Sequence, residues 1–217
     1  IHVVPVGVDP DLFKPLPDVS RVPGRIVTTA SADVVLKGLH YLLEAPAKLR
    51  AESDDAHLVI IGKPKDGGKA MDTIARLGLE GHVEWISGVP DQRIVELYSE
   101  AEVACVPSLY EGFSLPAIEA MSCGVPLVTT TGGALPEVTG THAETCFQVP
   151  PGDGDALAAM LRTVLDDPGL RDLLLAACLQ RVLDHGILLT TSLRHGSPAR
   201  ALLAEPFWRS LLGRALP

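Results

Sequence analysis

The sequence has few aromatic residues, no excess of basic charge and no long apolar run. Aromatic side chains make up 4% of the 217 residues, and 27 acidic residues outnumber 18 basic ones, for a formal net charge of −9. A general nucleic-acid binder needs a basic face, so this balance argues against that class, although a local phosphate site needs only a few donors. The longest apolar run, residues 173–179, is too short to cross a bilayer.

Cysteine is also scarce, and the four cysteines lie far apart. Cys105, Cys123, Cys146 and Cys178 form no C-x-x-C pair, which gives no support for a zinc site or a thioredoxin-type motif. We expect buried, reduced thiols in a cytosolic protein. The histidines show no metal-ligand spacing, so we predict no metal site. The chain shows no signal peptide and opens at Ile1 inside an apolar run, which we interpret as a strand entered part-way in a fragment of a longer protein.

Apolar residues are abundant, at 47%, and this content argues against disorder for most of the chain. Short apolar runs alternate with helical patterns, and this alternation predicts an α/β fold, a Rossmann-like parallel sheet with helices on both faces. Strands are predicted over residues 25–30, 57–62, 83–86, 103–107, 125–130 and 145–149, and helices over 38–50, 70–77, 91–101, 115–123, 155–165 and 170–183.

The length supports one domain, or one domain plus an extra segment. We predict a Rossmann-like domain over residues 1–185 and a tail of uncertain structure over residues 186–217, where the composition changes to four Arg, no Lys and a single acid. Within the domain, Asp91 is predicted to cap the helix that follows it, and Gly124 to end the helix that precedes it. Ligands of such sheets bind outside the carboxyl ends of the strands.

The most informative stretch, residues 107–126, lies where a strand ends and a helix begins. Gly112 and Ser114 suit a tight turn with close backbone approach, and Pro116 suits the first turn of a helix. The N–H groups of Ser114 and Leu115 would then point outward without partners. Together with the helix dipole they can hold an anion such as a diphosphate.

Two carboxylates flank this turn, Glu111 in the loop and Glu119 one turn into the helix. Glu119 could reach a neighbouring ribose diol or sugar ring, because a carboxylate accepts two hydroxyl donors. Either glutamate taken alone is more often an ordinary solvated charge. The complete string is what favours a binding site over that interpretation.

The string from Glu111 to Pro126, with a second Glu after seven residues and then Ala-Met-x-x-Gly-x-Pro, resembles the signature of retaining glycosyltransferases of the GT-B fold. The similarity is to the family 4 type, glycosyl transferases group 1, and to its C-terminal, donor-binding domain. Further stretches are similar to the same family: residues 4–9, residues 13–15, Lys37-Gly38, residues 61–62, residues 83–88, and Gly132-Gly133 with Glu137.

The resemblance implies a role for each matching residue. Glu111 would contact hydroxyls of the donor sugar near the reacting carbon, and Lys37 would act with it as a catalytic group. Glu119 would bind the nucleotide ribose. Lys37 and the amides around Ser114 and Leu115 would hold the diphosphate, and their positive charge and dipoles would stabilise the leaving group. The further donor-binding positions are Ser31, Gly62, Val89, Gly112 and Phe113, of which Val89 would lie near the base.

No cofactor and no metal ion are implied, and the donor would be a UDP- or GDP-linked sugar. One departure from the family pattern is Ser31, which stands where the family often has an arginine that grips the diphosphate. A second is the missing N-terminal half, which would supply the site for an acceptor sugar or lipid. The fragment is therefore expected to be inactive alone. A cytoplasmic location is expected, with peripheral association at the inner face of a membrane as an option for the whole enzyme.

Two other functions remain open at this point. The chain could be a non-catalytic nucleotide-sugar-binding module, because half of the cleft is missing. It could also be part of another GT-B-like enzyme, such as a nucleotide-sugar epimerase. The Glu111-to-Pro126 string favours the transferase, a retaining hexosyltransferase.

Overall fold

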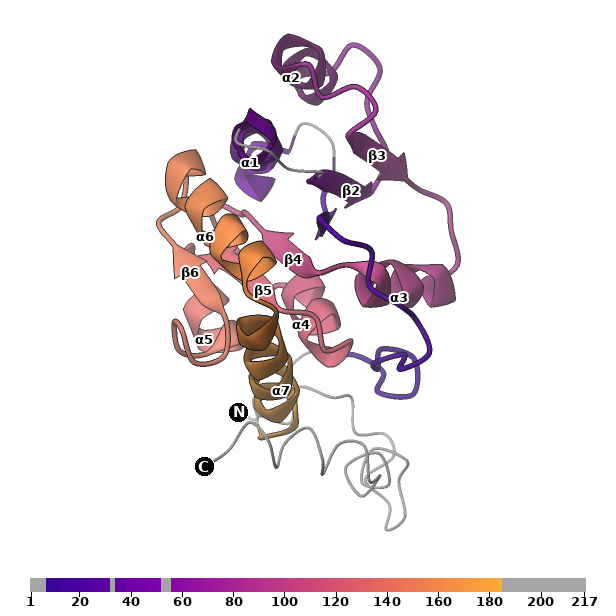
Figure 1. Cartoon of the computed structure of the whole chain (residues 1–217), viewed down its shortest axis with the longest axis vertical. Coiled ribbons are helices and arrows are strands. Elements are labelled where there is room, and N and C mark those ends of the chain that lie inside the picture. The colour runs from indigo at the N-terminus through magenta and orange to yellow at the C-terminus, as the bar shows by residue number, and fades with distance from the viewer. Residues whose placement is uncertain (1–6, 32–33, 52–55, 185–217) are drawn as a thin grey trace.

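The computed structural model describes residues 7–31, 34–51 and 56–184, and these residues form one parallel sheet with helices around it (Figure 1). The strand order is β3-β2-β1-β4-β5-β6, and every neighbouring pair is parallel. This is the Rossmann-like arrangement predicted from the sequence. The strands are β1 (Arg25–Thr29), β2 (His57–Ile61), β3 (Val83–Ile86), β4 (Val103–Val106), β5 (Leu127–Thr130) and β6 (Phe147–Val149).

Seven α-helices and one short 3-10 helix connect or follow the strands in the described residues. The two elements that the sequence analysis missed are the 3-10 helix and α5, which span three and five residues, too few to show a helical period. The helices are η1 (Val35–Lys37), α1 (Leu39–Ala51), α2 (Lys69–Leu77), α3 (Asp91–Glu100), α4 (Leu115–Ser122), α5 (Leu135–Thr139), α6 (Gly154–Asp166) and α7 (Pro168–Asp184).

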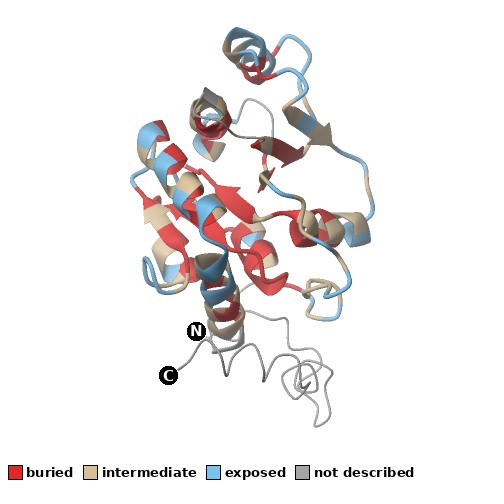
Figure 2. Ribbon diagram, viewed as in Figure 1, coloured by how far each residue is buried: buried red, intermediate tan, exposed pale blue. Residues whose placement is uncertain are grey.

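Apolar side chains fill both sides of the sheet, as the near-continuous apolar strands predict. Alternate residues of one strand face opposite sides: Ile26 packs with α1, α2 and α6, and Val27 packs with α3 and α4. Figure 2 shows buried residues along the strands and exposed ones on the outer faces of the helices. The predicted covering of both faces is confirmed.

Several local predictions at element ends are wrong, and the strand predicted over residues 145–149, for example, begins at Phe147. Asp91 does not cap α3: it is the first helical residue, Pro90 occupies the N-cap, and no side chain caps this end. The strand predicted from residue 125 begins at Leu127, because the N–H of Val125 donates to the Ala120 carbonyl at 3.1 Å and closes α4 instead. Gly124, at φ +67°, adopts the left-handed conformation that ends that helix, as predicted.

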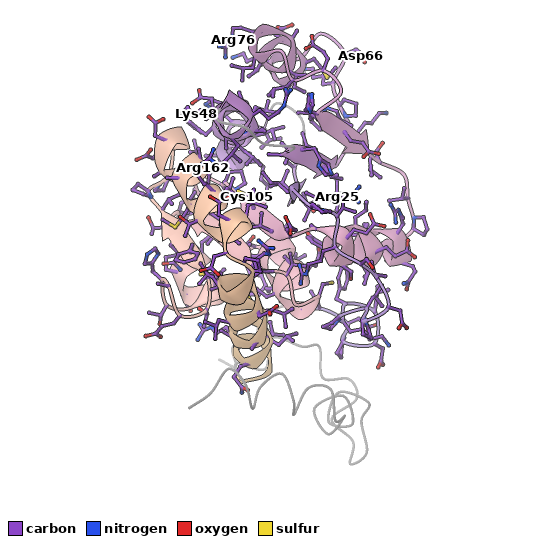
Figure 3. All side chains as sticks on the ribbon, in the orientation of Figure 1. Arg25, Lys48, Asp66, Arg76, Cys105 and Arg162 are labelled. Atoms are coloured by element: carbon purple, nitrogen blue, oxygen red, sulfur yellow. The ribbon has the colours of Figure 1, made fainter. Side chains whose placement is uncertain are left out.

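The four cysteines are free and buried, as the sequence analysis expected. Cys105, for example, lies inside the fold on β4 (Figure 3). Burial raises the pKa of its thiol far above the ordinary range, so the thiolate is suppressed. The predicted strand over residues 1–6 and the tail over residues 186–217 lie outside the described residues. Among the residues described, no helix is long and apolar enough to cross a membrane.

Candidate functional site

The candidate site lies where the strand order reverses, between β1 and β4. The chain leaves β1 toward β2 on one side and leaves β4 toward β5 on the other, and sheets of this kind bind ligands beyond the carboxyl ends of the strands at such a point. The loops after the two strands are tied together: the Leu109 N–H donates to the Leu36 carbonyl at 2.8 Å. Gly38 is required here, because a Cβ on it would collide with the Pro107 carbonyl oxygen. The Lys37-Gly38 pair and the Glu111 loop are therefore neighbours.

Lys37 and Glu111, the two residues assigned catalytic roles, form an ion pair. The Nζ of Lys37 lies 2.8 Å from Oε1 of Glu111, and their side chains are 33% and 12% exposed. The same Oε1 accepts a hydrogen bond of 2.7 Å from the Ser108 hydroxyl, and Ser108 is itself buried. Lys37 is thus engaged with Glu111 in this structure, and any anion in the site would share it with that carboxylate.

The backbone of Glu111 is held by the loop that follows β5. The Glu111 carbonyl accepts from the N–H of Ala134 at 2.8 Å, and Glu111 and Gly133 form an isolated bridge. Side chains at Gly132 and Gly133 would collide with the carbonyls of Leu109 and Glu111. The glycine pair therefore allows the two loops to touch, and its position fixes that of Glu111.

The N-terminus of α4 has an unusual conformation. Ser114, at the N-cap, has φ +115°, which is rare for a residue with a side chain, and its side chain does not cap the helix. Its hydroxyl is buried without a hydrogen-bond partner. No hydrogen bond from the N–H groups of residues 112–115 is found in the described part of the chain. Pro116 lies in the first turn, as predicted. This end of α4 can hold an anion, because its donors and helix dipole are unopposed.

Gly112 and Phe113 make different contributions to this turn. Nothing lies within 4 Å of the position that a Cβ on Gly112 would occupy, so no packing constraint demands glycine there. The positive φ of this turn falls on Ser114 and not on Gly112. Phe113 packs with the small cluster of Val8, Ile118 and Val138, so its ring anchors the turn to the fold.

Glu119 projects from the second turn of α4 toward α3. Its Oε2 lies 3.4 Å from the hydroxyl of Tyr98, and that hydroxyl lies 3.0 Å from Oγ1 of Thr29 at the end of β1. Burial raises the pKa of the Glu119 carboxyl; the Tyr98 hydrogen bond opposes this rise, and the charge of Asp91 adds to it. Val89 lies two residues before Asp91, the first residue of α3, which is also the helix that carries Tyr98.

Ser31 and Gly62 sit at the ends of β1 and β2. Ser31 is exposed, and its backbone carbonyl accepts from Val34 at 3.4 Å. Gly62 packs against the Ala30 carbonyl so closely that any side chain would collide with it, and its N–H donates to Ile86 at 2.8 Å. The structure thus gives Gly62 a packing role. The residues described contain no group of three or more His, Cys, Asp or Glu side chains that could hold a metal ion.

Three polar residues of this region were missed by sequence reasoning. The Ser108 hydroxyl contacts the Glu111 carboxylate, and the Tyr98 hydroxyl lies beside the Glu119 carboxylate. Thr29 contacts that Tyr98 hydroxyl from its other side. Thr29 ends a strand and Ser108 follows one, so their positions alone could have identified them as candidates. Tyr98 gave no signal, because a tyrosine on the apolar face of a helix reads as core.

Comparison with known proteins identifies relatives of this chain. The model of the family "Glycosyl transferases group 1" matches residues 20–175. An MMP alpha-(1->4)-mannosyltransferase of Mycolicibacterium hassiacum is 49% identical over 168 residues, which cover 77% of this chain and 40% of that protein. The chain spans about half the length, or less, of the first curated relatives that it matches.

Solved structures show the same fold. Sucrose-phosphate synthase from Thermosynechococcus elongatus superposes with a TM-score of 0.74 at 28% identity, over 94% of this chain and 53% of that one. Anabaena Alr3699/HepE in complex with UDP superposes with a TM-score of 0.71 at 22% identity, over 82% of this chain and 51% of that one. Together with the family match, these similarities show that the chain belongs to the glycosyl transferases group 1 family.

Proposed function

We propose that this chain is the donor-binding part of a retaining hexosyltransferase and binds a UDP- or GDP-linked sugar without a metal ion. The acceptor hydroxyl, on a sugar or a lipid, would be bound by a further domain, and transfer would need both. The chain alone is expected to bind the donor and not to turn it over. Free, buried thiols support a cytoplasmic location, and association of the whole enzyme with a membrane surface belongs to the same proposal.

The observation that carries this proposal is the uncapped start of α4. Ser114 there combines a left-handed backbone with a buried, unpartnered hydroxyl. Backbone strain of this kind costs on the order of 1–3 kcal/mol and persists where the surroundings impose it, often at ligand sites. A diphosphate would accept from the Ser114 hydroxyl and from the amides of residues 112–115, and it would be favoured by the helix dipole.

Lys37 and Glu111 would act at the junction of diphosphate and sugar. Lys37 lies 2.8 Å from Glu111, so a diphosphate bound beside the Glu111 loop would share the Lys37 charge with that carboxylate. As the bond between the sugar and the diphosphate breaks, negative charge grows on the diphosphate, and Lys37 and the α4 amides would stabilise it. Ser108 and the Gly132-Gly133 loop hold Glu111 in place, so that it can orient the sugar.

Isothermal titration calorimetry of UDP and GDP against this chain tests the proposal. We expect weak binding of one or both nucleotides that is the same in magnesium and in chelator. Loss of binding in chelator would contradict metal-free binding, and no binding of either nucleotide would contradict the donor site. Turnover by the chain alone would overturn the expectation that a further domain is required.

The relatives favour this function over the two other candidates. The mannosyltransferase of Mycolicibacterium hassiacum is named for glycosyl transfer, and the Anabaena protein is described in complex with UDP. A non-catalytic binding module would show the same nucleotide binding, so a transfer assay with the missing half supplied separates the two. Transfer in that assay supports the enzyme, and its absence with intact nucleotide binding supports the module.

A further inference from the structure

We propose that Tyr98 is a positioning residue that holds the Glu119 carboxylate for the ribose of the nucleotide, with Thr29 behind it. This inference rests on the proposed function, because it assumes a nucleotide whose ribose hydroxyls meet Glu119. It adds a residue from α3 and one from β1 to a site otherwise built from α4 and the loops around it.

The Tyr98 hydroxyl is buried at the meeting point of three elements. Tyr98 is 1% exposed, and its hydroxyl lies 3.0 Å from Oγ1 of Thr29, 3.4 Å from Oε2 of Glu119 and 3.4 Å from the carbonyl oxygen of Pro116. It thus touches both the first turn of α4 and the carboxylate that projects from the second turn. One hydroxyl therefore relates the anion-binding end of α4 to the side chain of Glu119.

The chemistry of the partners sets the direction of these hydrogen bonds. The Pro116 carbonyl and the Glu119 carboxylate only accept, so a hydrogen bond to either of them uses the Tyr98 proton. Either hydroxyl of the Tyr98–Thr29 pair can donate to the other, and when the Tyr98 proton is directed to Glu119 the Thr29 hydroxyl is the donor. Of the two acceptors, the charged carboxylate forms the stronger bond. Binding Oε2 toward Tyr98 leaves the other carboxylate oxygen, and further lone pairs on Oε2, for a pair of ribose hydroxyls.

Among the described residues, no other side chain donates a hydrogen bond to Glu119. A glutamate has several side-chain torsions, and a carboxylate that must be ordered when the ligand arrives costs affinity. Tyr98 orders Glu119 before the nucleotide binds. Without the hydroxyl, Glu119 would still reach the ribose, but that contact would contribute less.

The test compares each of UDP and GDP with its 2′,3′-dideoxy form by calorimetry. The readout is the ratio of dissociation constants, dideoxy over ribo, which isolates the ribose contribution from the diphosphate contribution. For the native chain we expect a ratio of roughly tenfold or more, as for hydrogen bonds to a charged group. In Tyr98→Phe the ratio should fall by about three- to tenfold, the value of one ordered side chain.

Two further variants separate positioning from general damage. Tyr41→Phe is the matched control, because it also removes a tyrosine hydroxyl. Tyr41 lies on α1 next to Gly152, on the opposite face of the sheet, so this variant should leave the ratio unchanged. In a Glu119→Ala background, Tyr98→Phe should not change the ratio further, because the group that it positions is gone. A fall of the same size in that background would show that Tyr98 acts elsewhere and would overturn the inference.

The remaining outcomes also decide between the two proposals. If the native chain discriminates ribo from dideoxy forms and Tyr98→Phe discriminates equally well, the positioning role is wrong while the proposed function stands. If the native chain binds both forms equally, the ribose role of Glu119 fails and the inference fails with it. If the native chain binds neither form, the proposed donor site itself is wrong. If Tyr98→Phe does not fold, Thr29→Val removes the donor behind Tyr98, and an unchanged ratio in that variant overturns the inference.

Discussion

Two helices that start at the carboxyl edge of the sheet, α4 and α6, begin in opposite ways. Asp153 caps α6 with its own side chain, which accepts from the N–H of Ala156 at 2.8 Å. Ser114 occupies the same position on α4 and is an equally good capping residue, yet its hydroxyl is buried without a partner. In α6 a side chain of the helix N-terminus satisfies one of the terminal donors, whereas in α4 no side chain does so.

This difference shows where the chain gives up local stability. A capping side chain contributes typically about 1 kcal/mol, and a residue with a side chain at positive φ costs a similar amount. Ser114 forgoes the first and bears the second. Phe113 beside it packs against the fold, and most of α4 is buried, so both neighbours of Ser114 in the chain are held in place. The start of α4 is thus arranged for a ligand, whereas the start of α6 is arranged for the helix.

The largest expected effect concerns the cation beside α4. Lys37→Ala should weaken the binding of a nucleoside diphosphate by roughly 10- to 100-fold, the value of a charge-assisted hydrogen bond, and leave the binding of the bare nucleoside nearly unchanged. Titrations with nucleoside, monophosphate and diphosphate measure the increment for each phosphate. Equal losses for nucleoside and diphosphate would show that Lys37 supports the fold rather than the anion.

The converse change is to add a positive charge at Ser31, the position where the family pattern described above often has an arginine. Ser31 is exposed, so a longer side chain has room. Ser31→Arg should strengthen the binding of the nucleoside diphosphate by roughly tenfold, because a guanidinium binds phosphate through two donors. An unchanged diphosphate increment in the same titration series would place the loop after β1 away from the anion.

A smaller effect compares the two caps directly. Asp153→Ala should lower the free energy of unfolding by about 1 kcal/mol and leave nucleotide binding intact. Ser114→Ala should leave the free energy of unfolding unchanged, because no hydrogen bond is lost. It should weaken the binding of the nucleoside diphosphate by roughly three- to tenfold. Chemical denaturation and calorimetry on both variants measure this. A stability loss at Ser114 as large as that at Asp153 would remove the distinction between the helices.

The smallest effect is a pH dependence at Glu119. Burial raises the pKa of Glu119, so the folded chain binds this proton more tightly than the unfolded chain. The protonated carboxyl therefore favours the folded state, and this contribution to the free energy of unfolding is lost as the pH rises through the raised pKa. Glu119→Gln stays neutral throughout. Its melting temperature should therefore exceed that of the native chain at pH 7.5, and the excess should shrink toward pH 4. An excess that is the same at both pH values would contradict the raised pKa.

Much of the fold could be predicted from the sequence because each strand or helix carries its own local signal. The apolar run at residues 57–62 ends in a glycine that must lie against Ala30, and Gly124 ends α4 by its backbone conformation. Element ends decided by competition between hydrogen bonds were harder to predict. The N–H of Val125 serves α4 rather than β5, and Asp91 enters its helix rather than capping it.

Candidate site residues could be proposed from the sequence only where they follow one another in the chain. The stretch from Glu111 to Glu119 could be read as a unit, and the structure places both carboxylates beside a turn with unpaired donors. Contacts between distant segments could not be read in this way. The pairing of Lys37 with Glu111, and the approach of Tyr98 and Thr29 to Glu119, arise from the order of strands in the sheet.

The most direct test of the anion site at α4 is an NMR titration of the ¹⁵N-labelled chain with UDP and GDP. The account predicts that the backbone amides of Ser114 and Leu115 shift most strongly as nucleotide is added, and that those of Asp153 and Ala156, at the capped start of α6, stay in place. Shifts of equal size at both helix starts, or none at Ser114 and Leu115 while the nucleotide binds, would contradict it.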